Sequence, residues 1–347
     1  MRSVDGWKGE CRVLALCPAD PYHPAPITFF VREAFVVSQL ERETGALFGP
    51  LWAGLSDEQY RASVELFVKR AQANDFDLDW LKGKTCLDAG CGSGRYSVAM
   101  ALHGAGAITA VDVSDSGLAE ARRRARDFPQ ISFQQASVLQ LPFADASFDF
   151  VWSAGVIHHT ADFDRALGEL VRVLRPGGKL FLLVYGAGGL RWKAIKALRP
   201  IVADLGAAFV DAAIQAAGLP ANNRKHFMDD LFVPVQLLTD WQTFLPKLHG
   251  HNLCNIMRWT GNTFDQEQSP DAQLEDLVKL LAIAASCETL AGSDRDRYLG
   301  RLAKDTAQLY VDTAKRAMID ASLSAESVRE IVIGQGNHRV VAEKAPA

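Results

Sequence analysis

The sequence predicts an α/β fold built around a parallel sheet, and three features of its pattern support this prediction. Between residues 84 and 186, short apolar segments alternate with longer segments whose apolar residues recur at helical spacing. Glycines or helix-capping residues bound these segments. After residue 186 the alternation stops and long amphipathic patterns follow. Strands that alternate with helices form βαβ units, and such units build a parallel sheet.

The elements of this core follow one another along the chain. Strands are predicted at TCLDAG, ITAVDVS, ISFQQASV, FDFVWSAG and KLFLLVYG. Helices are predicted at SGRYSVAMALHGA, DSGLAEARRRARDF and ALGELVRVL, and Pro176-Gly177-Gly178 is expected to close the last of them. The segments HNLCNIMRW and NHRVVAEK are expected to supply the final two strands. The arginine run at 122–126 is expected to form a solvated helix face.

The rest of the chain is expected to be largely helical. Apolar residues at helical spacing predict helices over 32–47 and 57–73. The predicted organisation is an N-terminal helical cap at 1–82, a core at 83–186, helical insertions at 187–250 and 261–335, a core strand at 251–260, and a final core strand with a tail at 336–347. Because the last strand follows both insertions, we expect their apolar faces to pack on the core as a lid.

Composition argues against several classes of protein. The 347 residues carry a net charge of −4, and the pI is about 6.1, so there is no basic field of the kind that nucleic-acid binding needs. No apolar run approaches the ~20 residues that span a bilayer, and no secretory signal is evident. Six scattered cysteines without zinc-ribbon spacing indicate a reduced, cytoplasmic protein. The oligomeric state is left open, with a homodimer as one option.

A glycine-rich loop follows the first predicted strand and reads Asp88-Ala89-Gly90-Cys91-Gly92-Ser93-Gly94-Arg95. Its spacing is G-x-G-x-G, whereas nicotinamide-binding enzymes carry G-x-G-x-x-G. Arg95 stands where the third glycine of that fingerprint would be. A carboxylate at Asp88 suits an ammonium group and would repel a pyrophosphate. A nicotinamide oxidoreductase is therefore disfavoured.

The run LDAGCGSGR resembles the first motif of class I S-adenosylmethionine-dependent methyltransferases. The resemblance continues through VDVS, ASVLQLPFADASFDFVWSAGVIHHT and LGELVRVLRPGGKLFLLVY, and it covers residues 83–186. It implies a Rossmann-like sheet that binds S-adenosylmethionine. The similarity is to the broad branch that contains ubiquinone-pathway and other small-molecule methyltransferases, and it implies a small-molecule methyl acceptor.

The resemblance also assigns residues to the cofactor. Asp88 and the backbone of Gly90, Gly92 and Gly94 would hold its methionine part. Asp112 would accept from both ribose hydroxyls, because one carboxylate can serve two neighbouring donors. Further expected contacts are Val113, Ser137 and Val138 around the adenine, Ser153 with Ala154 and Gly155 beside the sulfonium, and Trp52 and Tyr60 as an aromatic cap.

His158 and His159 follow the fourth predicted strand, on the edge where the methyl group would be transferred. We expect His159, or failing that His158, to touch the acceptor and assist its deprotonation, since an ordinary histidine titrates near neutral pH. The alternative is a hydrogen-bonded loop histidine. Some relatives carry E-x-x-E-H here and bind a divalent ion, but Gly155 replaces the first carboxylate, so no metal site is predicted.

Two other functions stay open at this point. The chain could methylate RNA or protein, although it lacks a basic segment with interleaved aromatic residues. It could also be a non-catalytic module that binds S-adenosylmethionine. The motifs leave undetermined whether the acceptor atom is oxygen, nitrogen, sulfur or carbon.

Overall fold

A computed structural model describes residues 38–219, 221–261 and 269–346. The first part of the predicted N-terminal cap, with Cys11 and Cys17, lies outside the described residues. The described cysteines are Cys86, Cys91, Cys254 and Cys287, and all four are free thiols.

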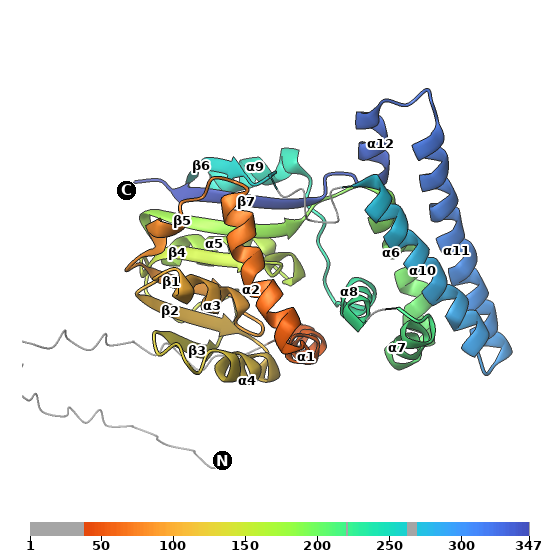
Figure 1. The fold of residues 1–347 in the computed structure, drawn as a ribbon, viewed down its shortest axis with the longest axis horizontal. Coiled ribbons are helices and arrows are strands. Elements are labelled where there is room, and N and C mark those ends of the chain that lie inside the picture. Colours follow the sequence, from red (N-terminus) through yellow and green to blue (C-terminus); the bar gives the residue numbers. More distant parts are fainter. Residues whose placement is uncertain (1–37, 220, 262–268, 347) are drawn as a thin grey trace, which may run out of the picture.

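Within the described residues, one sheet of seven strands forms the core, with the order β3-β2-β1-β4-β5-β7-β6 (Figure 1). The pairs among β1 to β5 are parallel, and β7 runs antiparallel to both of its neighbours. This arrangement confirms the predicted α/β class with its Rossmann-like sheet. The strands are β1 (Thr85–Ala89), β2 (Ala107–Asp112), β3 (Ile131–Gln135), β4 (Phe148–Ala154), β5 (Leu174–Tyr185), β6 (Leu253–Arg258) and β7 (Asn337–Lys344).

Helices cover both faces of the sheet because successive strand residues point to opposite sides. Cys86 packs with residues of α2 (Asp57–Gln72) and α3 (Arg95–Leu102), while Leu87 packs with residues of α5 (Phe163–Val173) and α9 (Trp241–Gly250). Helix α9 falls within the predicted 187–250 insertion, yet it packs on the core. The remaining elements of this part are α1 (Gln39–Ala53), α4 (Asp115–Arg124) and the 3-10 turns Leu78–Leu81 and Ile157–His159.

The Pro-Gly-Gly segment does not close a helix as expected. Helix α5 ends at Val173, and β5 begins at the next residue. Leu174 pairs with Phe148 and Lys179 with Phe150, so the intervening residues form an irregularity within the strand pairing. Gly177 adopts a φ of 74°, which a glycine tolerates without strain.

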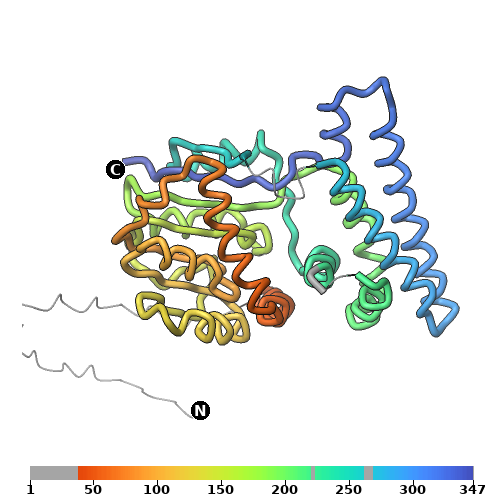
Figure 2. The backbone as a smooth tube through the Cα atoms, viewed as in Figure 1, coloured from red at the N-terminus to blue at the C-terminus, as the bar shows by residue number. Residues whose placement is uncertain are grey.

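The other helices form what we call the helical lobe. Its apolar residues pack mainly on one another in a cluster of their own, so the expected packing on the core holds for α9 but not for the lobe helices of the two insertions. Both insertions leave the sheet after strands of the same direction, β5 and β6, and therefore meet beyond the same edge (Figure 2). The lobe contains α6 (Leu190–Leu205), α7 (Ala207–Ala216), α8 (Ala221–Phe232), α10 (Pro270–Leu290), α11 (Asp294–Ile319) and α12 (Ala325–Val332).

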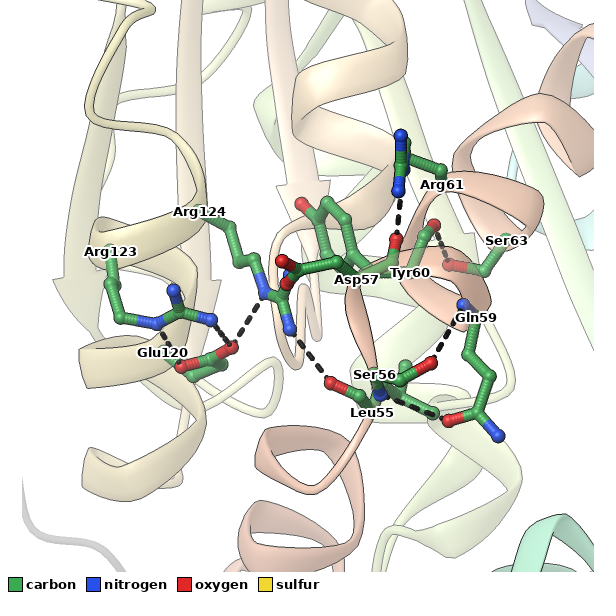
Figure 3. Close-up of polar contacts among 10 residues, drawn as sticks. All are labelled: Leu55, Ser56, Asp57, Gln59, Tyr60, Arg61, Ser63, Glu120, Arg123 and Arg124. Carbon is green, nitrogen blue, oxygen red and sulfur yellow. Dashed lines mark hydrogen bonds and ion pairs between the residues drawn. The ribbon is translucent and has the colours of Figure 1, made fainter.

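Arg124 of the arginine run joins α4 to the start of α2 instead of lying in solvent (Figure 3). Its guanidinium donates to the Leu55 carbonyl at 2.7 Å and to Glu120 at 2.6 Å, and it pairs with Asp57. It also lies over the Tyr60 ring, 4.6 Å from the centroid. The Arg124 side chain is 10% exposed, whereas that of Arg123, which binds the same Glu120, is 54% exposed.

Replacing Arg124 by methionine should lower the free energy of unfolding by about 2–3 kcal/mol, because charged hydrogen bonds at a shielded site are lost. Arg123→Met is the matched control and should cost less than about 0.5 kcal/mol. Urea denaturation followed by circular dichroism measures both values. Equal losses in the two variants would contradict the anchoring role of Arg124.

Candidate active site

A cavity of about 670 Å³ lies at the carboxyl edge of the sheet, between the core and the helical lobe. Its size is in the range of small-molecule sites. The core contributes the glycine-rich loop and the ends of β2, β4 and β5, and α1 and α2 contribute residues from the N-terminal part. The lobe contributes Arg191, Lys225, His226, Asp229, Gln273 and Asp276.

The glycine-rich loop forms one wall of the cavity. The N–H groups of Gly90 and Cys91 both donate to the Val111 carbonyl, at 2.8 and 2.9 Å, which ties the loop to the end of β2. Gly90 has a φ of 82°, and a Cβ there would lie 2.3 Å from Val156 Cγ2. Val156 therefore occupies the place that a side chain at Gly90 would need, and the loop packs this closely on Val156 only because residue 90 is a glycine.

Asp112 lies on the cavity wall at the end of β2. Its two carboxylate oxygens accept from the backbone N–H groups of Gly92 and Ser114, each at 2.8 Å. Burial raises the pKa of Asp112, and these backbone hydrogen bonds oppose the rise. Since each carboxylate oxygen can accept more than one hydrogen bond, the fixed carboxylate suits a ligand with two neighbouring hydroxyls.

Val113 and Val138 also line the cavity, but Ser137 does not. The Ser137 hydroxyl donates to Glu41 and accepts from the Leu139 N–H at 2.9 Å. Glu41 lies in α1 and lines the cavity. Sequence reasoning missed Glu41, because the motif region alone does not indicate that α1 crosses this edge.

The Asp88 carboxylate does not face the cavity. Strand alternation turns it toward α3, where it accepts from the Ser97 hydroxyl at 2.6 Å. Burial raises its pKa to about 7, with the hydrogen bond from Ser97 acting in the opposite direction. The side chain is therefore a buried support for α3, which corrects its expected contact with the cofactor.

Other predicted residues also lie away from the cavity wall. A Cβ at Gly94 would lie 3.1 Å from Ala121, so this glycine permits close packing of the loop on α4. Ser153 is buried in β4, and Tyr60 is covered by Arg124. Trp52, in contrast, lines the cavity, and a Cβ at Gly92 would lie 3.2 Å from its ring.

The two histidines have different surroundings. His158 is fully buried, and neither ring nitrogen has a hydrogen-bond partner among the described residues, so it does not reach the cavity. His159 lines the cavity. Its Nδ1 donates to the Val235 carbonyl at 2.9 Å, which leaves the lone pair on Nε2. Burial lowers the pKa of His159 to about 4, so the ring is neutral at pH 7 but only weakly basic.

Asp229 of α8 is the strongest functional candidate that sequence reasoning missed. Its Oδ1 lies 3.9 Å from His159 Nε2, and its Oδ2 accepts from the Tyr185 hydroxyl at 3.1 Å. Burial, with the neighbouring Asp230, raises the pKa of Asp229 to about 7. The sequence does contain one indication of this role. Lys225 and Asp229 are opposite charges four residues apart, which places them on the same face of a helix.

Residues 38–219, 221–261 and 269–346 contain no group of three or more His, Cys, Asp or Glu that could hold a metal ion. Over the same ranges, no helix combines the length and apolar character that a membrane span requires.

The comparisons with known proteins concern the core. Residues 87–182 match the family model described as a methyltransferase domain. Residues 87–182 form a methyltransferase domain. This domain belongs to the S-adenosylmethionine-dependent class I family that the motifs resemble, which confirms the predicted family.

Several curated relatives share this domain. The chain is 36% identical over 115 residues to the 27-O-demethylrifamycin SV methyltransferase of Amycolatopsis mediterranei, which covers 31% of this chain and 42% of that protein. It is 37% identical over 134 residues to the 2-phytyl-1,4-naphtoquinone methyltransferase of Nostoc, covering 37% of this chain and 56% of that protein. The chain thus spans about half the length of these relatives.

Two solved structures are similar at low identity. One is phosphoethanolamine N-methyltransferase 2 of Haemonchus contortus, 16% identical with a TM-score of 0.46 over 90% of this chain and 61% of that chain. The other is a geranyl diphosphate methyltransferase, 16% identical with a TM-score of 0.40 over 79% of this chain and 78% of that chain.

The buried Asp88 of the methyltransferase domain should make its stability depend on pH. A carboxyl whose folded pKa lies above its unfolded value stabilises the protein below the unfolded pKa, and this contribution is lost as pH rises through about 7. Asp88→Asn keeps an acceptor for Ser97 and stays uncharged. Relative to wild type, the variant should therefore gain a few kcal/mol of stability between pH 5 and 8.

Chemical denaturation at a series of pH values measures this difference. Ser97→Ala is the control, because it removes the hydrogen bond but keeps the titrating carboxyl, and its pH dependence should be at least as steep as that of wild type. Parallel curves for wild type and Asp88→Asn would show that Asp88 does not titrate as described.

Proposed function

We propose that the chain transfers a methyl group from S-adenosylmethionine to a small-molecule acceptor and releases S-adenosylhomocysteine. The observation that carries the proposal is Asp112, fixed by two backbone donors on the wall of a cavity inside a methyltransferase domain. When bound, the cofactor supplies a sulfonium-activated methyl group, which the acceptor's lone pair takes by direct displacement while the carbon–sulfur bond breaks. The protein's part is alignment, exclusion of water and proton acceptance.

Residues of this chain would hold the cofactor along the loop and the end of β2. Asp112 would accept from the ribose hydroxyls, and the backbone of Gly90 and Gly92, which lines the cavity, would lie against the methionine part. Val113 and Val138 offer apolar contacts to the adenine. We propose that Glu41 accepts a hydrogen bond from the adenine amino group. Ser137 is uncharged, and Glu41, which is hydrogen-bonded to it, supplies a negative charge beside it.

The acceptor is proposed to be a small molecule enclosed between the core and the lobe. The relatives that share the domain are named for a rifamycin derivative and a naphthoquinone. The net charge of −4 disfavours a nucleic-acid substrate. We retain a cytoplasmic location as part of the proposal, because the cysteines are free thiols wherever the structure describes them.

Asp229 is a better proton acceptor for the acceptor group than His159. A base works best when its pKa lies near the working pH, and burial brings the pKa of Asp229 to about 7 but that of His159 to about 4. We therefore assign proton acceptance to Asp229. His159 would orient the acceptor through its Nε2 lone pair. The ionisable neighbours of Asp229 come from four elements. They are Tyr185 on β5, His159 in the loop after β4, Arg199 on α6, and Lys225, His226 and Asp230 on α8.

A screen for methyl transfer tests the proposed function. The protein is incubated with isotopically labelled S-adenosylmethionine and metabolite extracts, and mass spectrometry searches for a labelled product. A labelled small molecule that depends on the protein is the expected result. Tight binding of S-adenosylhomocysteine without any labelled product would instead favour a non-catalytic binding module.

Asp112→Ala should weaken S-adenosylhomocysteine binding by at least about 100-fold, because two hydrogen bonds to a carboxylate are lost at about 1.5–3 kcal/mol each. Isothermal titration calorimetry measures the affinity. Asp115→Ala, an exposed acid in the first turn of α4, is the matched control and should bind like wild type. Unchanged affinity in Asp112→Ala would overturn the assigned cofactor site.

The turnover number should rise with pH to a plateau above about 7, because Asp229 must be deprotonated to accept a proton. Asp229→Asn should lower turnover by about 10²–10⁴-fold and abolish the rise. His159→Ala should lower turnover but keep the rise, since its pKa lies well below this range. A rise that persists in Asp229→Asn and disappears in His159→Ala would reverse the two roles.

A further inference from the structure

Two cationic side chains meet at Trp52, one from the core and one from the lobe. The Arg95 guanidinium lies over the indole ring with its Cζ 4.2 Å from the centroid, and Lys225 Nζ lies over the same ring. Arg95 is the first residue of α3, directly after the glycine-rich loop, and Lys225 belongs to α8. Both side chains line the cavity.

In the described part of the chain, neither cation has an acid bonded to it, and Asp88 and Asp229 attract Arg95 and Lys225 only from beyond bonding distance. Among the described residues, no carboxylate forms an ion pair or hydrogen bond with Arg95 or Lys225. By contrast, Arg191 in the same cavity pairs with Asp230 and Asp276. Burial and the nearby Arg95 lower the pKa of Lys225 well below its usual value, and burial lowers that of Arg95.

An excess of partly buried positive charge is unfavourable unless a ligand supplies the counter-charge. A carboxylate is suited to this place, because it can accept from a guanidinium and an ammonium together. The place also adjoins the loop that would hold the methionine end of the cofactor, since a Cβ at Gly92 would lie 3.2 Å from Trp52.

We propose that Arg95 and Lys225 form a carboxylate site that spans the core and the helical lobe, and that it binds the α-carboxylate of the cofactor. The inference rests on the proposed function and adds to it a role for the lobe. Lys225 and Asp229 lie one helical turn apart on α8, so a cofactor held by Lys225 also fixes the helix that presents Asp229 to the acceptor. Cofactor binding would therefore also order the acceptor side of the cavity.

The test compares two ligands that differ in the amino-acid tail. S-adenosylhomocysteine carries the carboxylate, whereas 5′-methylthioadenosine keeps the nucleoside and thioether but lacks the tail. By calorimetry, Lys225→Met should weaken S-adenosylhomocysteine binding by about 10- to 100-fold and change 5′-methylthioadenosine binding by less than twofold. Lys225→Arg should restore most of the affinity. Lys196→Met, which removes an exposed lysine from α6, is the matched control and should have no effect.

Hydrogen exchange supplies a second readout. S-adenosylhomocysteine should protect the amides of α8 in wild type, and it should not do so in Lys225→Met. Equal weakening of both ligands in Lys225→Met would show a general packing defect and overturn the proposal. A second result would also overturn the proposal. If Lys225→Met keeps its affinity for S-adenosylhomocysteine but no longer binds a carboxylate-bearing acceptor found in the screen, the site belongs to the acceptor. If wild type binds neither nucleoside, the proposed function itself fails.

Discussion

The site depends on one constraint of topology, which is that parallel strands end at a common edge. The glycine-rich loop follows β1, Asp112 ends β2, and His159 follows β4, and they converge because those strands are parallel. The same constraint places the helical lobe. Its two insertions follow β5 and β6, which point the same way, so both emerge beyond the edge where the cavity lies. Seven strands in this order therefore determine both where a ligand can bind and what covers it.

Desolvation then decides the chemistry of the groups that meet there. Burial raises the pKa of Asp229 and lowers that of His159. In this site the carboxylate is therefore the stronger base, whereas in water the imidazole would be. Burial also destabilises the charges of Arg95 and Lys225 on the cavity wall. Such groups are costly in a protein without ligand, and functional sites are where proteins commonly retain them. The helical lobe is more than a cover, because it brings Lys225 and Asp229 to a site that the core alone would leave incomplete.

The helical lobe also shows that burial can be satisfied in more than one way. The amphipathic patterns of 187–250 and 261–335 require apolar partners, but the pattern does not say which partners. The two insertions supply each other's partners and form a separate apolar cluster, while α9, from the first insertion, packs on the sheet instead. Arg124 makes the same point for a polar residue. It belongs to a run of arginines that is predicted to face solvent. In the structure, Leu55 and Asp57, which are distant in sequence, bind its guanidinium.

The sequence by itself determined the core, because period-2 and helical patterns depend on neighbours along the chain, and the motif LDAGCGSGR depends on local backbone geometry. Strands at 85–89 and 337–344 and the position of Asp112 were all predictable for this reason. Only the tertiary structure decided which side chains face the cavity. Strand alternation turned Asp88 away, Arg124 covered Tyr60, and α1 and α8 delivered Glu41, Lys225 and Asp229. These are contacts between segments far apart in the chain. A pattern along the sequence does not indicate which distant segments come together in space.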